Sequence, residues 1–508
     1  MAMEVVIDGN SLTLEQVTAV AAARARVSVA PWAKTRAGAA RKVVDRLVES
    51  RAVAYGVTTG FGKLSDVAIP PDRLAELQVN LVRSHAAGVG DLLPEREVRA
   101  MMLLRANVIA KGFSGARIDL AVLLCEMLNA GLYPQIPEQG SVGASGDLAP
   151  LAHLALSVIG EGTLQSNGRC GPAAEMLNGA GLQRITLASK EGLTLINGTQ
   201  AHTSIGALAL VDAHTLWRTA HVAGAMSLEA LLGTPVAFDA RIQDARGQLG
   251  QAASAAFLRE LLTDSEIRES HRHNDPRVQD AYALRCMPQV HGPVLDAIDF
   301  AAAVIGRELN AATDNPLVFS ESGELLSGGN FHGQSVAMAL DFLAIALTNL
   351  ATISERRTDR LVHPDLNQGL PPFLTRDAGV NSGFMMAQVT AASLASECKV
   401  LSHPASVDTI PTDGNKEDVV PMAMGAAWKL RRVVHNVQHV IAIELMCAAQ
   451  GVEYRRPLRA ARSVEEAVGV VRELVAPLAA DRVLAPDISA LAAAVAAGRF
   501  TDVAMATA

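Results

Sequence analysis

The residues best suited to chemistry in this sequence lie in a short glycine-rich stretch, residues 140–147. It reads Gly-Ser-Val-Gly-Ala-Ser-Gly-Asp, so glycine recurs at every third position around Ala144, Ser145 and Gly146. Glycine adopts backbone conformations that a Cβ forbids, and it adds no side-chain bulk. The main chain itself can therefore come into close contact with a neighbouring segment here.

One reaction uses such a backbone. If the nitrogen of Gly146 attacks the carbonyl carbon of Ala144, a five-membered ring closes, and Ser145 can then lose its hydroxyl to leave an exocyclic methylene. Two waters leave, and the product is an electrophile, 4-methylideneimidazol-5-one. Because no ordinary side chain is an electrophile, this group would do work that otherwise falls to a bound cofactor.

Simpler interpretations of the same stretch stay open on these residues alone. A glycine-rich turn more often binds phosphate or precedes a helix, and Ser145 or Asp147 could cap the apolar helix predicted from residue 148. A P-loop is disfavoured because no Gly-Lys-Ser/Thr follows. A dinucleotide site is disfavoured because the preceding residues 133–138 contain too much proline for a buried strand.

The composition predicts a mainly helical protein. The chain has 508 residues, of which 50% are apolar but only 4% aromatic, so its core must consist chiefly of alanine, leucine and valine. A core rich in alanine and leucine favours closely packed helices. The length suits two or three ordinary domains or one large interlocked unit.

Charge, cysteines and histidines exclude several functions. A net charge of −8 without a basic block argues against a nucleic-acid-binding or membrane-surface protein. Five scattered cysteines without a Cys-x-x-Cys pair predict free thiols in a reducing cytosol. His271 and His273 have no further ligands at useful spacing, so we expect no metal site. Residues 1–8 have neither a basic leader nor an apolar secretory core, which favours a cytoplasmic location.

Two further segments carry side chains that could do chemistry. Tyr55 stands in a loop with three glycines, residues 55–62, and Tyr282 and Arg285 are three residues apart, on one face of a predicted helix. The planar fork of arginine suits the carboxylate of an amino acid. On these residues alone, packing for Tyr55 and a surface ion pair for Arg285 are the commoner roles.

Taken in order, these segments resemble the aromatic amino acid ammonia-lyases, the family of histidine, phenylalanine and tyrosine ammonia-lyases. Residues 140–153 resemble the family signature, and the similarity runs from about Tyr55 to Asp418. The resemblance implies a mainly α, fumarase/aspartase-like ammonia-lyase fold. A smaller, mixed N-terminal domain (residues 1–200) would carry the Ala-Ser-Gly loop, and residues 201–508 would form a long central helix bundle and a C-terminal helical region.

The resemblance also implies how the protein works as an assembly. The electrophile would form autocatalytically from Ala144, Ser145 and Gly146, with no external cofactor. The protein would be a homotetramer whose active sites draw on more than one subunit, and its partner in the reaction would be a small amino acid substrate.

Single residues acquire roles from the same resemblance. Tyr55 would be the base that takes the β-proton, and Arg285 would bind the substrate carboxylate. A tyrosine base needs a lowered pKa, which positive helix ends aimed at the site would help to provide. The other residues would form the electrophile (Ala144, Ser145, Gly146), orient the amine (Asn197, Gln279, Tyr282) or line the pocket around the ring (Ser84, His85, Asn315, Phe331, Glu417).

The predicted substrate is L-histidine, with trans-urocanate and ammonia as products. The chain resembles histidine-specific members at Ser84, His85, Cys286 and Glu417. A carboxylate at Glu417 suits a substrate ring with N–H groups, because an unmet buried donor is costly.

Four positions depart from the histidine-specific pattern: Thr58, where asparagine is usual, and Lys416, Val419 and Pro421. A relative that acts on phenylalanine, tyrosine or another aryl amino acid, or a 2,3-aminomutase, therefore stays open. So does a catalytically silent helical scaffold, whose chain would not be two waters lighter than its encoded sequence.

Overall fold

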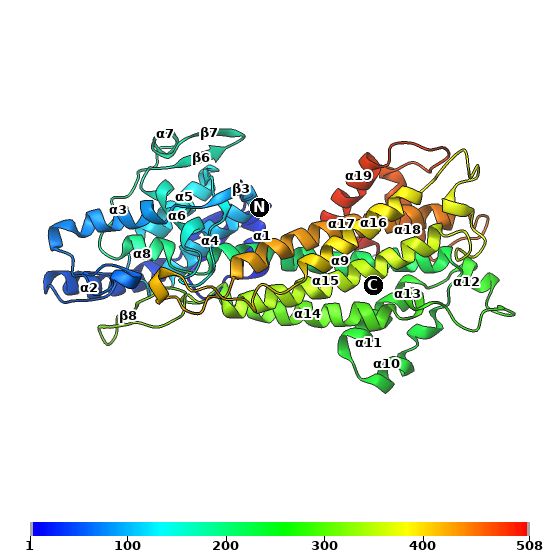
Figure 1. The fold of residues 1–508 in the computed structure, drawn as a ribbon, viewed down its shortest axis with the longest axis horizontal. Helices are drawn as coiled ribbons and strands as arrows, with labels where there is room; N and C mark the ends of the chain where they lie inside the picture. The colour runs from blue at the N-terminus through cyan, green and yellow to red at the C-terminus, as the bar shows by residue number, and fades with distance from the viewer. Residues whose placement is uncertain (1–3, 505–508) are drawn as a thin grey trace. The chain divides into compact units, whose positions relative to one another are not determined.

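The computed structural model describes residues 4–504, and helices dominate it (Figure 1). The described residues pack as two compact units, each assembled from three stretches of chain. Unit 1 consists of residues 4–208, 302–341 and 404–428, and unit 2 of residues 209–301, 342–403 and 429–504. The mainly helical prediction is confirmed. The predicted domain division between residues 200 and 201 stays a prediction.

Unit 1 is a mixed part with eight helices of its own and several small sheets. The helices are α1 (Leu14–Ala21), α2 (Pro31–Glu49), α3 (Leu74–His85), α4 (Glu95–Ala110), α5 (Asp119–Ala130), α6 (Leu148–Val158), α7 (Ala173–Gly179) and α8 (Glu191–Ile196). Helix α4 is the core of this unit, because every residue from Glu97 to Ala110 is buried, and α1, α2 and α5 pack against it.

The strands of unit 1 are short and pair in four small sheets. Strand β1 (Glu4–Ile7) runs parallel to β2 (Arg26–Val29), with Val5 opposite Val27. The antiparallel pairs are β3 (Val89–Leu92) with β5 (Pro137–Gln139), β4 (Tyr133–Pro134) with β6 (Thr163–Ser166), β6 with β7 (Arg169–Pro172), and β8 (Leu317–Phe319) with β9 (Glu324–Leu326). These strands connect helices and contribute little core.

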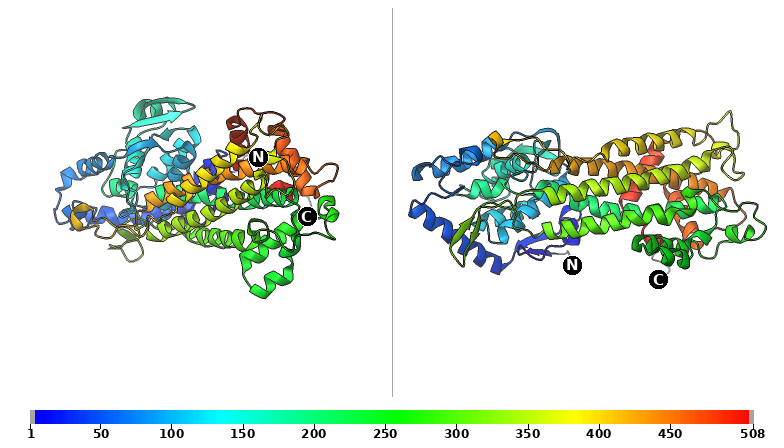
Figure 2. Two further views of the ribbon diagram at one scale, coloured as in Figure 1. Left: turned by 45° about the vertical axis from the view of Figure 1, so that its right-hand side comes forward. Right: turned by 60° about the horizontal axis from the view of Figure 1, so that its bottom comes forward.

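Four long helices contain residues of both units: α9 (Gln200–Ala230), α14 (Met287–Glu308), α15 (Gln334–Val362) and α17 (Ala423–Glu453). In unit 2 they run side by side with α16 (Met385–Leu401) (Figures 1 and 2). The remaining helices there are α10 (Ala240–Arg246), α11 (Leu249–Leu261), α12 (Glu266–Ser270), α13 (Tyr282–Arg285), α18 (Arg462–Leu474) and α19 (Ala485–Ala496). The predicted long helix bundle is confirmed.

A buried charge network ties the long helices together within unit 2. The carboxylate of Glu444 on α17 accepts hydrogen bonds from Ser227 on α9 (2.7 Å) and from Ser354 on α15 (2.6 Å). It also accepts from Arg357 Nη2 (2.8 Å), and both charged side chains are fully buried. A buried ion pair is tolerated only when its polar atoms are satisfied in this way.

Among the helices described within residues 4–504, α15 has the length and apolar composition that a membrane span would need. Two thirds of its most apolar window, 67%, is buried inside the fold. Such burial is typical of a core helix.

Short 3-10 helices complete the described chain. They are η1 (Gly62–Leu64), η2 (Pro71–Arg73), η3 (Pro235–Phe238), η4 (Pro372–Leu374), η5 (Asp413–Asn415) and η6 (Asp502–Ala504). Two of them, η1 and η5, contact each other in unit 1, beside the cavity described next.

Candidate active site

An open cavity of about 1510 Å³ lies within unit 1. The structure brings together nine of the predicted site residues around it: Tyr55, Ser84, His85, Ala144, Ser145, Asn197, Asn315, Phe331 and Glu417. Gly146 follows Ser145 directly and is buried. Segments separated by up to several hundred residues therefore converge where the glycine-rich stretch lies.

The backbone at Gly146 is pressed against Gly198. The two residues form a parallel bridge, and a Cβ on Gly146 would lie 2.1 Å from the carbonyl oxygen of Gly198. Gly146 also has a φ of +76°, which disfavours any residue with a Cβ. The close approach that the sequence suggested is present, and it requires glycine at both positions.

Asp147 anchors the end of this stretch to the start of α9. Its Oδ2 accepts hydrogen bonds from the backbone nitrogens of Ala201 (2.8 Å) and His202 (2.9 Å). Its Oδ1 accepts from Ser141 Oγ (2.8 Å) and lies 2.9 Å from His202 Nδ1. A carboxylate is favoured at a helix N-terminus, where the free N–H groups and the helix dipole are both positive.

The prediction that Ser145 or Asp147 caps the helix after the glycine-rich stretch, α6, is wrong for both side chains. Asp147 stands at the N-cap position of α6, but its side chain makes no cap hydrogen bond there. Its carboxylate serves α9 instead. Ser145 donates its hydroxyl hydrogen bond to Glu417 Oε1, across 272 positions of sequence.

Glu417 is held by a small turn. The backbone nitrogen of Thr412 donates to the carbonyl oxygen of Glu417 (2.9 Å), and the Thr412 hydroxyl donates to Glu417 Oε2. Each carboxylate oxygen of Glu417 thus has a hydroxyl partner, one of which belongs to Ser145. The carboxylate is therefore fixed at the cavity wall beside the Ala-Ser-Gly segment.

Asn197 ends α8 and is held by a fully buried network. Its Nδ2 donates to Asp314 Oδ1 (3.2 Å) and to the carbonyl oxygen of Asn315 (3.2 Å), while Arg105 Nη1 donates to the Asn197 carbonyl (2.8 Å). Asp314 Oδ2 lies 3.0 Å from Lys190 Nζ. Burial lowers the pKa of Lys190, an effect that Asp314 opposes, and burial lowers the pKa of Arg105 to about 10.

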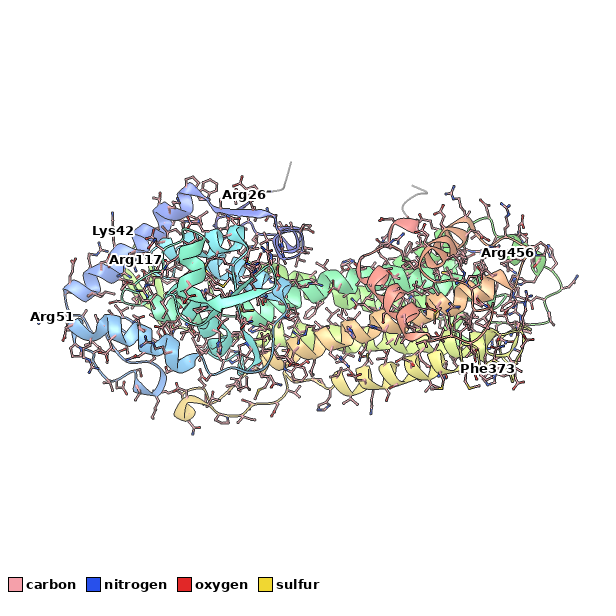
Figure 3. All side chains as sticks on the ribbon, turned by 90° about the horizontal axis from the view of Figure 1, so that it is seen from above. Arg26, Lys42, Arg51, Arg117, Phe373 and Arg456 are labelled. Atoms are coloured by element: carbon pink, nitrogen blue, oxygen red, sulfur yellow. The ribbon has the colours of Figure 1, made fainter. Side chains whose placement is uncertain are left out.

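The start of α8 is fixed from outside. Glu191 is buried, and Arg117, which Figure 3 labels, binds its carboxylate through Nε (2.8 Å) and Nη2 (2.5 Å). Such a two-point contact between guanidinium and carboxylate sets direction as well as distance. The short helix that ends at Asn197 is thereby pinned at both ends.

His85 lines the cavity, and a contact within α3 orients its ring. Its Nδ1 lies 2.8 Å from the carbonyl oxygen of Leu81, one turn earlier in α3. Because a carbonyl only accepts, Nδ1 carries the proton, and Nε2 of the neutral ring is then an acceptor. Ser84 is its exposed neighbour, and its hydroxyl contacts the same Nδ1 (3.0 Å).

Tyr55 lies in a loop that Asp413 holds in place. The Tyr55 hydroxyl accepts a hydrogen bond from Gly62 N (3.4 Å), and the Asp413 carboxylate accepts from Lys63 N (3.1 Å). A Cβ on Gly62 would lie 1.9 Å from Asp413 Oδ2, so the contact between η1 and η5 depends on that glycine. Asp413 therefore connects the loop that contains Tyr55 to the turn that carries Glu417.

The pKa of Tyr55 is raised within this chain. Burial is the largest cause, and the carboxylates of Asp413, Glu417 and Asp314 add to it, while the hydrogen bond from Gly62 opposes it. This direction is the opposite of what a tyrosine base requires. A positive charge from a group other than these residues would be needed to lower the pKa of Tyr55 instead.

Gln279, Tyr282 and Arg285 belong to unit 2 and do not line the cavity. Tyr282 is 70% exposed, and the guanidinium of Arg285 lies 4.7 Å from the centre of its ring, which confirms the predicted shared helix face. Within the described residues, Nε of Arg285 is buried without a hydrogen-bond partner.

Thr58 does not line the cavity. Its hydroxyl accepts from Ala54 N (2.9 Å) and donates to the Ala52 carbonyl (2.7 Å), so it braces the loop internally. Lys416 and Val419, two other departures from the histidine-specific pattern, do line the cavity and are exposed.

Sequence reasoning missed several residues that hold the site together: Arg105, Lys190, Asp314, Thr412 and Asp413. For Asp314 a signal existed, because it directly precedes Asn315. Arg105 stands in a largely apolar stretch of α4, and Lys190 directly precedes Glu191, which pairs with Arg117 instead, so neither local segment indicated a link to Asn197 or Asp314.

Comparison with known proteins agrees with this geometry. The family model of the aromatic amino acid lyases matches residues 12–473. The chain is 55% identical over 497 residues to a histidine ammonia-lyase of Anaeromyxobacter sp. (strain K), covering 96% of this chain and 98% of that one.

Two solved structures are also similar to it. The histidine ammonia-lyase of Trypanosoma cruzi has a TM-score of 0.92 at 44% identity, over 99% of this chain and 95% of that one. The tyrosine aminomutase of Streptomyces globisporus has a TM-score of 0.93 at 38% identity, over 99% of this chain and 98% of that one.

Proposed function

The chain belongs to the aromatic amino acid lyase family, and on that premise we propose that it is a histidine ammonia-lyase, which eliminates ammonia from L-histidine to give trans-urocanate. The observation that carries the choice of substrate is the carboxylate of Glu417 at the cavity wall, in contact with Ser145. It offers an acceptor for a ring N–H directly beside the segment that forms the electrophile.

The prosthetic group would form from Ala144, Ser145 and Gly146. The close packing of Gly146 on Gly198 and the anchoring of Asp147 on α9 fit this group, because they compact the backbone on the carboxyl side of Ser145. Once formed, the group supplies an electron sink for the substrate amine. No external cofactor is part of the proposal.

The proposed ring site discriminates by its acceptors. The Glu417 carboxylate would accept from the N–H of an imidazole, and His85 Nε2 would accept from the second N–H of its protonated form, whereas a phenyl ring would leave both acceptors unpaired. Each unpaired polar group costs about 1–3 kcal/mol, which favours histidine over phenylalanine or tyrosine. Thr58, one of the four departures from the histidine-specific pattern, does not line the cavity.

The proposed base is Tyr55, and the carboxylate anchor is Arg285, with Asn197, Gln279 and Tyr282 around the amine. The raised pKa of Tyr55 and the unpartnered Nε of Arg285 both support a site completed by another copy of the chain. A cation from that copy would favour the tyrosinate. We infer a homotetramer with shared active sites because the resemblance to the family implies one, and a cytoplasmic location because the five cysteines are scattered and free.

Ultraviolet absorbance tests the substrate. Histidine, phenylalanine and tyrosine are incubated in parallel with the enzyme, and histidine alone is expected to give the absorbance of its acrylate, urocanate. A β-amino acid product would indicate an aminomutase instead. No urocanate from histidine, with cinnamate or coumarate from the other two, would refute the substrate proposal.

A further inference from the structure

Asp413 joins two segments of chain that border the cavity. Residues 61–69 and 413–419 supply much of its lining, and every residue in them is exposed or half-buried. In the described part of the chain, the hydrogen bonds between these segments run to one side chain, because Lys63 N lies 3.1 Å from Asp413 Oδ2 and 3.3 Å from Oδ1. This carboxylate is the polar link between the two segments.

The link lies next to the hydrogen bond that Tyr55 accepts. Gly62 N donates to the Tyr55 hydroxyl (3.4 Å), and the next nitrogen along the chain, that of Lys63, donates to Asp413. A Cβ on Gly62 would lie 1.9 Å from Asp413 Oδ2, so the carboxylate packs directly on this glycine. The direction of the Gly62 N–H therefore depends on Asp413.

The turn that carries the carboxylate has an unusual backbone. Asp413, Gly414 and Asn415 have φ values of +47°, +57° and +67°. Aspartate and asparagine enter this left-handed region more readily than most residues, but it still costs free energy and persists where surrounding contacts determine it. The hydrogen bonds of the Asp413 side chain to Lys63 are contacts of that kind.

We propose that Asp413 is a positioning residue for Tyr55, because its hold on the loop backbone keeps the tyrosine hydroxyl in the place from which it takes the β-proton. The inference rests on the proposed function, in which Tyr55 is the base. Asp413 acts through the backbone of Gly62 and Lys63 and takes no part in the proton transfer itself.

The carboxylate has two opposite effects on Tyr55. Its contact orders the loop, whereas its charge adds to burial, the largest cause, in raising the pKa of the phenol, together with Glu417 and Asp314. Other charged groups that line the same cavity are Asp66, Lys416 and Asp418. The two effects can be separated, because an amide at position 413 keeps an oxygen for Lys63 N but carries no charge.

Two substitutions at position 413 make the test, and both remove the charge. Asp413→Asn keeps an acceptor and Asp413→Ala does not, so the difference between them measures the contact. We expect kcat for histidine to be at least about 10-fold lower in Asp413→Ala than in Asp413→Asn, with a smaller change in KM, because a misplaced base is costly in kcat. The acid-side limb of kcat/KM should lie at higher pH in Asp413→Ala, because the Gly62 donor is no longer held at Tyr55.

A second measurement needs no substrate. Trypsin cleaves after lysine, and Lys63 is exposed but lies inside the 3-10 helix η1, so the loop has to open before the protease can bind it in extended form. Native proteolysis followed by intact mass should cut Asp413→Ala after Lys63 at least about 10-fold faster than wild type. Asp413→Asn should be cut at close to the wild-type rate.

Asn415→Ala is the matched control. Asn415 stands in the same turn with a φ of +67°, is exposed and is absent from the cavity lining. The variant places an alanine in left-handed backbone, as Asp413→Ala does, but leaves the contact with Lys63 intact. It should keep the wild-type kcat and the wild-type rate of cleavage.

Equal kcat values or equal cleavage rates in Asp413→Ala and Asp413→Asn would overturn the inference. So would an Asn415→Ala variant as impaired as Asp413→Ala, since strain in the turn would then explain the loss. If circular dichroism shows Asp413→Ala to be poorly folded, Asp413→Gly decides, because glycine adopts this backbone without a steric cost. An Asp413→Gly variant that behaves like Asp413→Asn refutes the inference.

Tyr55→Phe keeps the two proposals separable. A Tyr55→Phe enzyme that still turns over histidine would refute the proposed base, whatever the proteolysis shows. If Tyr55→Phe is inactive while Asp413→Ala and Asp413→Asn behave alike, the base stands and the role of Asp413 falls.

Discussion

Replacing Asp147 by asparagine should destabilise the protein and impair maturation together. The carboxylate of Asp147 has four donors around it, from Ala201, His202 (twice) and Ser141. An asparagine that keeps its oxygen on the two backbone N–H groups turns its NH₂ towards His202 Nδ1. The proton of His202 must then move to Nε2, which is buried without a partner in the described structure.

The cost of this rearrangement can be estimated. An unpaired buried donor costs about 1–3 kcal/mol, and the charge lost at the start of α9 removes about 0.3–1 kcal/mol. We expect Asp147→Asn to lose about 2–3 kcal/mol of unfolding free energy. Because the Asp147 carboxylate also anchors the residue after Gly146 to the start of α9, the fraction of chain that is two waters lighter should fall as well.

Urea denaturation followed by circular dichroism, with intact mass on the same preparation, checks both effects. Asp45→Asn is the matched control, because the Asp45 side chain is 47% exposed and its i,i+4 ion pair with Arg41, within α2, is worth about 0–1 kcal/mol. An Asp147→Asn variant that unfolds at the same urea concentration as Asp45→Asn, and is fully matured, would refute the reasoning.

Three further outcomes follow from the site. Asp413→Asn removes a carboxylate that raises the pKa of Tyr55. Since a base acts in its deprotonated form, the acid-side limb of the pH profile of kcat/KM should move to lower pH. A limb that does not move would contradict this. Gly198→Ala places a Cβ 2.4 Å from Gln200 Oε1, so little chain should lose both waters by intact mass; a fully matured variant would be inconsistent with that packing. His85→Leu should lower kcat/KM for histidine about 5- to 150-fold while the inhibition constant of phenylalanine stays unchanged, and equal losses for both would argue against ring recognition.

The sequence predicts the fold class and most of the cavity for identifiable reasons. A chain rich in alanine and leucine favours closely packed helices, and the glycines at 140, 143 and 146 indicate a backbone that residues with a Cβ rarely adopt. Spacing of three residues also predicts the contact between Tyr282 and Arg285. In each of these cases the local pattern of residues is sufficient to predict the structural feature.

Partnerships across long stretches of chain cannot be predicted in that way. Asp147 looks like a cap for its own helix, and only the folded chain reveals that it caps α9. The raised pKa of Tyr55 likewise arises from burial and from carboxylates more than 250 residues away, such as Asp314 and Asp413. These effects depend on tertiary contacts that no local pattern encodes.

The proposed division of each site between subunits makes a quantitative prediction. Tyr55 lines the cavity of unit 1, whereas Arg285 in unit 2 has a buried Nε without a partner within residues 4–504. If the two residues meet only across copies of the chain, Tyr55→Phe and Arg285→Lys should each be nearly inactive as pure homo-oligomers. Mixing them lets one chain supply an intact Tyr55 and another an intact Arg285.

In randomly mixed oligomers, about a quarter of the sites should combine the two intact residues, because each site draws its two parts independently from equal pools. Coexpressed variants should therefore recover about a quarter of wild-type activity. The control is the double variant Tyr55→Phe/Arg285→Lys coexpressed with Tyr55→Phe, which has no chain with an intact Tyr55 and should recover none. If each chain completed its own site, the two single variants would show no recovery, and the shared-site proposal would be abandoned.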